Sequence, residues 1–140
     1  MSYLVILLLV SGRMSLCSLI HREYYLIPLA KSWNDAQVYC RENYFDLAVI
    51  GDREDLKRLS NTAAAAGVNG QLWIGLKKDG AAVWLWSVGD TQSGHGLVNE
   101  YTNWASSPES SHHCGGMRHD GKWLSALCQS ELPFVCQGCE

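Results

Sequence analysis

The stretch SWNDAQVYCREN, residues 32–43, has the pattern of an amphipathic helix. Ser32 followed three residues later by Asp35 resembles a capping box, in which short polar side chains satisfy the first backbone N–H groups of a helix. Apolar residues follow at helical spacing: Trp33, Ala36 and Cys40. We therefore expect a first helix here, with the Cys40 side chain on its buried face.

Further elements are expected on both sides of this helix. REYYLIP, residues 22–28, is aromatic and apolar and ends at a proline, which is typical of a strand. DLAVI, residues 46–50, predicts a short buried strand. A second helix should begin at Asp52, a good N-cap, and end at Gly67. Its apolar face would carry Leu56, Leu59 and Ala63.

The second half of the sequence changes to strands, turns and loops. Four apolar stretches predict strands: residues 72–76, 83–86, 122–128 and 133–136. An Asp79-Gly80 turn should join the first two of these strands. Residues 89–116 are rich in Gly, Ser, Asn and His and predict a long loop region, which Tyr101–Trp104 interrupts. Helices first and strands afterwards predict one α+β domain.

The composition is ordinary for a globular domain. The 140 residues carry a formal net charge of −3 without a cluster of Lys or Arg, which argues against nucleic acid and anionic membranes as partners. Six Trp and six Tyr are many for this length, and such rings usually fill the core of a small domain. Four tryptophans are expected there: Trp73, Trp84, Trp86 and Trp104.

The first residues predict a secretory signal. Leu4–Val10 is an unbroken apolar run followed by small residues, and it is too short to span a bilayer. We expect cleavage after Cys17, so that residues 1–17 are a signal peptide and residues 18–140 form one secreted, extracellular domain. An apolar N-terminal strand is the alternative. In an oxidising compartment the cysteines would form disulfides by default.

Seven short pieces of the chain, together with its cysteines, resemble a C-type lectin-like domain of the compact short form. The resemblance covers Glu23–Cys136. Its pieces are WNDAQVYC, DLAVI, WIGL, VWLWSVGD, YTNW, GKW and FVC. It implies an α+β fold of two helices, antiparallel sheets and a long loop region, acting in extracellular recognition.

The resemblance also implies two framework disulfides, Cys40–Cys136 and Cys114–Cys128. The first would tie the first helix to the last strand, and the second would pin the loop region to the closing strands. Cys139 is left over. If the signal is cut after Cys17, Cys139 would be available to a disulfide-linked partner, and if the cut falls before Cys17, the two cysteines could pair.

Sugar-binding members of this family hold Ca²⁺ in the long loop through acidic and amide side chains. Their positions correspond here to Ser107-Pro108-Glu109, to His112 and to Leu124-Ser125. Glu109 is the one carboxylate, and Leu124 offers no side-chain oxygen. We therefore expect a degenerate calcium site without a metal cofactor and a trans bond before Pro108. The candidate ligand-binding positions are Ser107, Glu109, His112, Leu124 and Ser125.

Other chemistries fit the sequence less well. Zinc-ligand residue types occur together at His112, His113, Cys114 and His119, but their spacing matches no paired-ligand pattern. A disulfide-bonded Cys114 could not act as a nucleophile. No Ser-His-Asp arrangement is recognisable, and the carboxylate pair Glu54 and Asp55 is expected in the solvated first turn of the second helix. The protein is therefore not expected to be an enzyme.

The sequence thus predicts a recognition module that binds a glycan, or a cell-surface or secreted protein, through its long-loop surface and without Ca²⁺. One alternative is a calcium-dependent, carbohydrate-binding lectin with an unusual ligand set. A second is an antifreeze-type variant of the same fold. No stretch after the signal is long and apolar enough to predict a membrane span.

Overall fold

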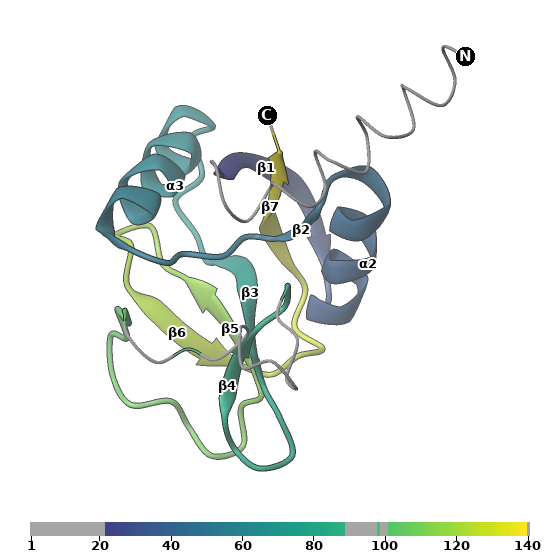
Figure 1. Cartoon of the computed structure of the whole chain (residues 1–140), viewed down its shortest axis with the longest axis vertical. Coiled ribbons are helices and arrows are strands. Elements are labelled where there is room, and N and C mark those ends of the chain that lie inside the picture. The colour runs from purple at the N-terminus through teal and green to yellow at the C-terminus, as the bar shows by residue number, and fades with distance from the viewer. Residues whose placement is uncertain (1–21, 89–97, 99–100, 140) are drawn as a thin grey trace, which may run out of the picture.

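Two helices and seven strands form the part of the chain that the computed structural model describes, residues 22–88, 98 and 101–139 (Figure 1). In chain order the elements are β1 (Arg22–Lys31), α2 (Trp33–Asn43), β2 (Asp46–Leu47), α3 (Arg53–Ala65), β3 (Leu72–Lys78), β4 (Trp84–Trp86), β5 (Cys114–Met117), β6 (Trp123–Ala126) and β7 (Leu132–Cys139). The predicted α+β class is confirmed.

One sheet brings the two ends of the described chain together. β1 pairs antiparallel with β7, from Arg22 opposite Cys139 to Ile27 opposite Phe134. The strand order is β1-β7-β3-β5-β6, with β2 paired to β7 and β4 paired to β3. Figure 1 shows both helices at the end of the sheet where β1 and β7 pair, and β4–β6 with their loops at the other end.

The signal-peptide prediction and the odd-cysteine prediction fall outside the described residues. The predicted signal peptide, residues 1–17, and the predicted start of the domain at residue 18 both precede the first described residue, Arg22. Cys17 and the Cys139 side chain are likewise outside the description, so the pairing of Cys139 stays a prediction.

The first predicted helix is confirmed together with its cap. The Ser32 hydroxyl accepts a hydrogen bond from the Asp35 amide (3.2 Å). The three residues expected on its apolar face, Trp33, Ala36 and Cys40, are fully buried. The Trp33 indole N–H also donates to the Ile74 carbonyl (2.8 Å), which attaches the start of α2 to β3.

The second helix differs from its prediction at one residue. Asp52 caps α3 as expected, since its carboxylate accepts from the Asp55 amide (2.8 Å). Asp55, however, is 2% exposed and was wrongly predicted to be solvated. It accepts hydrogen bonds from Arg22 (2.6 Å), from Arg58 and from the Gly51 amide (2.9 Å). These partners neutralise a charge that would otherwise be costly to bury.

Two local predictions need correction. DLAVI is buried throughout, but only Asp46–Leu47 is a strand. The β3–β4 connection is longer than the expected two-residue turn, because the Asp79 carboxylate accepts from the Ala81 and Val83 amides, both at 2.9 Å. Within this connection Ala82, with φ of 63°, has the left-handed conformation that usually favours glycine.

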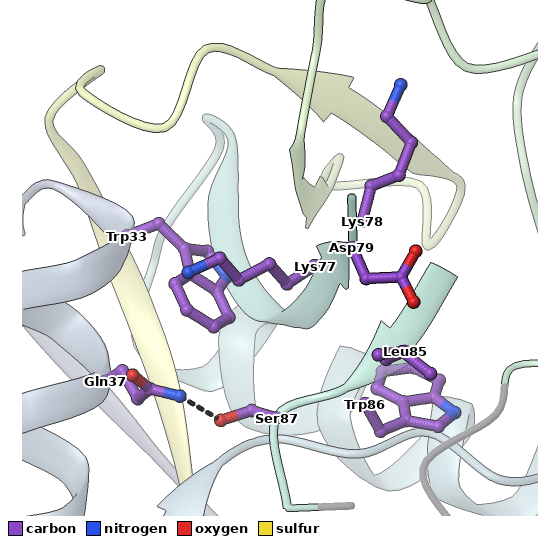
Figure 2. A pocket seen from close by; sticks show the side chains of 8 residues that line it. All are labelled: Trp33, Gln37, Lys77, Lys78, Asp79, Leu85, Trp86 and Ser87. Atoms are coloured by element: carbon purple, nitrogen blue, oxygen red, sulfur yellow. Dashed lines mark hydrogen bonds between the residues drawn. The ribbon is translucent and has the colours of Figure 1, made fainter. Parts of the chain in front are cut away.

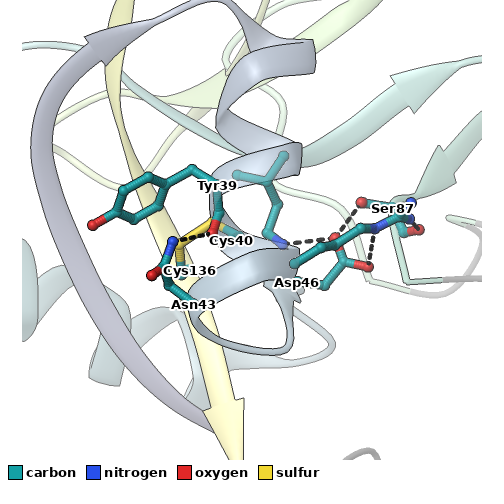
Figure 3. Close-up of a disulfide and its surroundings, with 8 residues drawn as sticks. Tyr39, Cys40, Asn43, Asp46, Ser87 and Cys136 are labelled. Carbon is teal, nitrogen blue, oxygen red and sulfur yellow. Dashed lines mark hydrogen bonds and ion pairs between the residues drawn. A yellow bond between two sulfur atoms is a disulfide. The ribbon is translucent and has the colours of Figure 1, made fainter.

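Both framework disulfides are present, as the resemblance implied. Cys40–Cys136 links α2 to β7 and closes a loop with a sequence separation of 96 residues (Figure 3). Cys114–Cys128 links the start of β5 to the chain after β6, with a separation of 14 residues. Cys40, Cys136 and Cys114 belong to the buried cluster that packs α2 against the sheet.

The tryptophan prediction is half correct. Trp73 and Trp86 are buried, with exposed fractions of 0% and 8%. Trp84 and Trp104 are only half-buried. They lie at the edge of the core and pack on each other, with ring centroids 4.9 Å apart. Within the described residues, no helix is long and apolar enough to cross a membrane.

Candidate functional site

The loop that carries the predicted site residues is held alongside β6. The Ala105 amide donates to the Trp123 carbonyl, and the Trp123 amide donates to the Asn103 carbonyl, both at 2.9 Å. The Asn103 side-chain amide also donates to the Gly121 carbonyl (2.7 Å). These bonds fix the approach of the chain to β6, so that the residues after Ala105 lie close to Ser125.

Three of the predicted site residues meet at the Ser125 hydroxyl. Ser125 Oγ accepts a hydrogen bond from the Glu109 amide (3.1 Å) and lies 3.0 Å from His112 Nδ1. His112 Nε2 lies 3.6 Å from Glu109 Oε2. The His112 amide also donates to the Glu109 carbonyl (3.1 Å), which closes a tight turn between these two residues. We name Glu109, His112 and Ser125 the loop cluster.

The Ser125 hydroxyl can both donate and accept hydrogen bonds within the loop cluster. Because Ser125 Oγ accepts from the Glu109 amide, its own hydroxyl proton can be donated to His112 Nδ1. The other ring nitrogen of His112, Nε2, faces the Glu109 carboxylate. The backbone amide of Glu109 and the side chain of His112 therefore meet at one hydroxyl group.

The loop cluster places Ser, His and Glu together, which was not recognised in the sequence. The contact between His112 and the Glu109 carboxylate is 3.6 Å long, beyond hydrogen-bond distance, and the Glu109 side chain is 71% exposed. An acid in that position does not hold the imidazole in one orientation, as a nucleophile's base requires. The geometry therefore supports a binding surface better than a catalytic triad.

A lysine that the sequence did not single out braces the same loop. Lys78, at the end of β3, donates from Nζ to the Ser110 carbonyl (2.9 Å) and more weakly to the Glu109 carbonyl (3.5 Å). Its amide donates to the His113 carbonyl (2.8 Å). The ammonium also lies 5.8 Å from the centre of the Trp84 ring. The signal in the sequence was the Lys77-Lys78 pair at the end of a predicted strand.

The two remaining predicted positions do not join the loop cluster. Ser107 is exposed, and its side chain makes no hydrogen bond to another described residue. Leu124 is half-buried on β6, where a hydrocarbon side chain supplies packing only. The described residues contain no cis peptide bond, so the bond before Pro108 is trans, as expected.

A layer of aromatic rings packs the first part of this loop, Tyr101 and Trp104, against β4 and β6. Trp123 is fully buried and packs edge-to-face against Trp86, Trp104 and Tyr101, with centroid distances of 5.4, 5.6 and 5.9 Å. Trp104 in turn packs against Trp84. Such pairs stabilise beyond the area they bury, so this layer provides a firm base for a loop with little regular structure.

The β5–β6 connection is fixed by an ion pair at the surface. Arg118 donates from Nε to Asp120 (3.1 Å), and the Lys122 amide donates to the same carboxylate (3.1 Å). The Arg118 hydrogen bond holds the pKa of Asp120 well below its ordinary value. Gly121, with φ of 87°, completes the turn in a conformation that favours glycine.

The zinc alternative finds no geometric support in the described residues. No three His, Cys, Asp or Glu side chains among them lie together as a metal-binding group. Cys114 is bonded to Cys128, which also removes it as a nucleophile.

A two-helix, single-sheet domain with a buttressed long loop and two disulfides defines a class of recognition domain. The chain belongs to the C-type lectin family: the family's lectin C-type domain matches residues 29–138. It is 32% identical over 127 residues to regenerating islet-derived protein 3-gamma of Mus musculus, a match that covers 81% of this chain and 69% of the relative.

Solved structures agree with this assignment. Human lithostathine superposes with a TM-score of 0.72 at 23% identity, covering 85% of this chain and 92% of the other. The carbohydrate-recognition domain of cow CD23, solved in the presence of a GlcNAc2Man3 oligosaccharide, gives a TM-score of 0.71 at 27% identity and covers 85% and 88%. The first likeness shows the fold alone.

Proposed function

We propose that this chain is an extracellular recognition module, not an enzyme, that binds a glycan or a protein through its long-loop surface without Ca²⁺. The surface is centred on the loop cluster and the rim formed by Ser107 and Leu124. The observation that carries the proposal is that Glu109, His112 and Ser125 contact one another where calcium-binding members of the family present oxygen ligands.

The donor set does not fit a calcium ion. Ca²⁺ takes six to eight oxygen ligands, and its affinity rises with the charge that those ligands carry. Glu109 supplies the one carboxylate of the corresponding positions, and Ser125 Oγ already accepts a backbone hydrogen bond. His112 offers nitrogen, which a hard cation disfavours, and Leu124 offers no side-chain ligand.

The loop also has an internal substitute for an ion. Lys78 brings a positive charge to the carbonyl oxygens of Glu109 and Ser110, the type of group that a cation would otherwise bind. Cys114–Cys128 anchors the other side of the loop to the chain that follows β6. A loop held by these bonds can present a fixed surface at any calcium concentration.

The extracellular assignment is supported by the cysteines. Two well-separated disulfides persist in an oxidising compartment and are rare in the cytosol. Both stabilise a domain that would act outside the cell. The secretory signal expected in residues 1–17 is part of the same proposal.

Calorimetry combined with a glycan array tests the proposal. We expect no saturable heat when CaCl₂ is titrated to millimolar concentration, and glycan or protein binding that is the same with calcium and with EDTA. Saturable calcium binding together with EDTA-sensitive binding to the array would overturn the proposal and favour the calcium-dependent alternative.

A matched pair of variants locates the surface. Glu109→Gln and Ser125→Ala should weaken ligand binding, since the first changes the exposed carboxylate of the loop cluster and the second removes the hydroxyl that joins its residues. Glu54→Gln changes an equally exposed carboxylate on α3 and should leave binding as it was. Equal effects of the loop and helix variants would show that the ligand binds elsewhere.

A further inference from the structure

A pocket of about 230 Å³ lies between helix α2 and the β3–β4 hairpin, outside the loop cluster (Figure 2). Its lining residues come from both elements: Trp33, Gln37, Lys77, Lys78, Asp79, Leu85, Trp86 and Ser87. This volume lies below the range of about 300–1,000 Å³ that is typical of sites for drug-sized ligands. The pocket therefore has room for one ring rather than an extended chain.

The pocket combines an apolar surface with a cation. Lys77 and Leu85 are directly opposite partners on the antiparallel strands, so their side chains lie on the same face of the hairpin. Figure 2 shows the Lys77 side chain reaching over the Trp33 ring, with its ammonium 5.0 Å from the ring centre. The wall of the pocket therefore consists of the Leu85 side chain and the hydrocarbon part of Lys77, with the Lys77 ammonium at its end.

The Lys77 ammonium has no acidic partner among the described residues. Its polar contact is a long one to the Asn34 side-chain oxygen (3.4 Å). Lys78 also lines the pocket, and its Nζ bonds only backbone carbonyls. The Lys78 ammonium is already bonded to the loop carbonyls, so Lys77 is the cation that the pocket offers to a ligand. An anionic group is thus the complement that the pocket lacks.

The orientation of the Gln37 side-chain amide is fixed by its hydrogen bond to Ser87. The Ser87 hydroxyl donates to the buried Asp46 carboxylate, a bond drawn in Figure 3. Ser87 Oγ can therefore only accept from Gln37, whose side-chain N–H lies 2.9 Å away. The amide oxygen of Gln37 is left as an acceptor for a hydroxyl group. The second carboxylate oxygen of Asp79 is a further acceptor, because both of its turn bonds are made by Oδ1.

We propose that this pocket binds a single sugar ring that carries an anionic group. The Lys77 ammonium would bind the anion, Gln37 and Asp79 would accept hydrogen bonds from ring hydroxyls, and Leu85 would contact the apolar face of the ring. Hydroxyl acceptors distributed around an apolar wall suit a sugar better than an acidic peptide, which would also need partners for its backbone. The proposal concerns a second site, so it stands whether or not the loop surface binds calcium.

The test is an NMR titration of the isotope-labelled full chain with methyl β-D-glucuronide. Methyl β-D-glucoside is the matched probe, since it has the same ring with a hydroxymethyl group in place of the carboxylate. We expect saturable shifts of the Gln37, Lys77, Leu85 and Ser87 amides and about tenfold tighter binding of the glucuronide, as one charge-assisted contact implies. Equal affinities for the two sugars, or glucuronide shifts confined to the loop cluster, would overturn the proposal.

Two further experiments distinguish a sugar site from a site that binds any carboxylate. Lys77→Gln should weaken glucuronide binding about tenfold, whereas Lys57→Gln, at an exposed lysine on α3, should not change it. The N-acetyl, N′-methylamide derivative of glutamate is the peptide probe, and sodium acetate is the anion alone. If either binds as tightly as the glucuronide, the site recognises a carboxylate without the sugar, and the proposal is wrong.

Discussion

Asp46 and Asp55, in the helical half of the molecule, are 4% and 2% exposed, whereas the Glu109 side chain in the loop half is 71% exposed. The helical half comprises β1, α2, β2, α3 and β7, and the loop half comprises β4, β5, β6 and the segments that join them. Each buried carboxylate is paired with at least one arginine: Arg41 for Asp46, and Arg22 and Arg58 for Asp55. Glu109 has only a long contact to a histidine.

This difference indicates where the sequence is free to change. Removing one partner of a buried ion pair typically costs about 3–5 kcal/mol, whereas an exposed pair contributes about 0–1 kcal/mol. The buried carboxylates of the helical half are therefore needed for the stability of the fold. An exposed side chain of the loop half such as Glu109 can be exchanged at a smaller cost to the fold, provided that other bonds hold the loop.

The largest expected effect is the loss of unfolding free energy when a disulfide is removed, and this loss should differ between the two halves. Replacing Cys40 and Cys136 by Ala should lower the free energy of unfolding by about 5 kcal/mol, and replacing Cys114 and Cys128 by about 3 kcal/mol, because the longer closed loop restricts the unfolded chain more. Urea unfolding of both variants measures this difference. A larger loss of unfolding free energy in the variant without Cys114–Cys128 would contradict the comparison.

The next effect concerns the buried charge on α3. Asp55→Asn should destabilise the fold by about 3 kcal/mol, since it leaves Arg22 and Arg58 without their carboxylate. The lower end of the range applies because both arginines are partly exposed. Glu54→Gln, one residue earlier and exposed, is the control and should change stability by less than about 0.5 kcal/mol.

A smaller and more local effect is expected at the loop. Lys78→Met should keep the overall fold but increase hydrogen exchange at the amides of residues 109–113 about fivefold, which corresponds to a loss of about 1 kcal/mol. Hydrogen-exchange mass spectrometry resolves this segment from β5. Lys57→Met is the matched control. Unchanged exchange in the Lys78 variant would show that Lys78 does not order the loop.

The last effect is a pH dependence in the helical half. Burial and the nearby Asp55 charge raise the pKa of Tyr24 well above its ordinary value of about 10. The neutral phenol is therefore favoured by folding, so its contribution is fully present below pH 10 and is lost as the pH rises above 10. Tyr24→Phe should flatten this alkaline decline in unfolding free energy. It should also cost about 1 kcal/mol at pH 7, because the Val49 carbonyl loses its donor.

Local patterns predicted the helical half well. Ser32 and Asp52 are caps whose partners lie three residues away, so the sequence contains the whole interaction. The disulfide pairs followed from the resemblance to a family. Burial of Asp55 could not be predicted in this way, because it depends on Arg22, which is 33 residues distant and is brought near by the pairing of β1 with β7.

The candidate site was predicted less completely. Sequence positions identified Glu109, His112 and Ser125, but the hydrogen bonds that join them depend on a turn with no strong local signal. Lys78 was missed because its role requires β3 to end beside a loop more than 30 residues later. Trp84 and Trp104 were placed in the core by residue type alone, whereas they lie at its edge.

The antiparallel pairing of β1 with β7 sets how the domain would be tethered. Arg22 lies opposite Cys139, and Figure 1 places this pair of strands at the end of the molecule away from the β4–β6 loops. If a surface, a fusion partner or a disulfide-linked chain is attached near either of these residues, the domain is held at the same end. The loop cluster would then face outward, so capture through the C-terminal end is the orientation to use when arrays are probed.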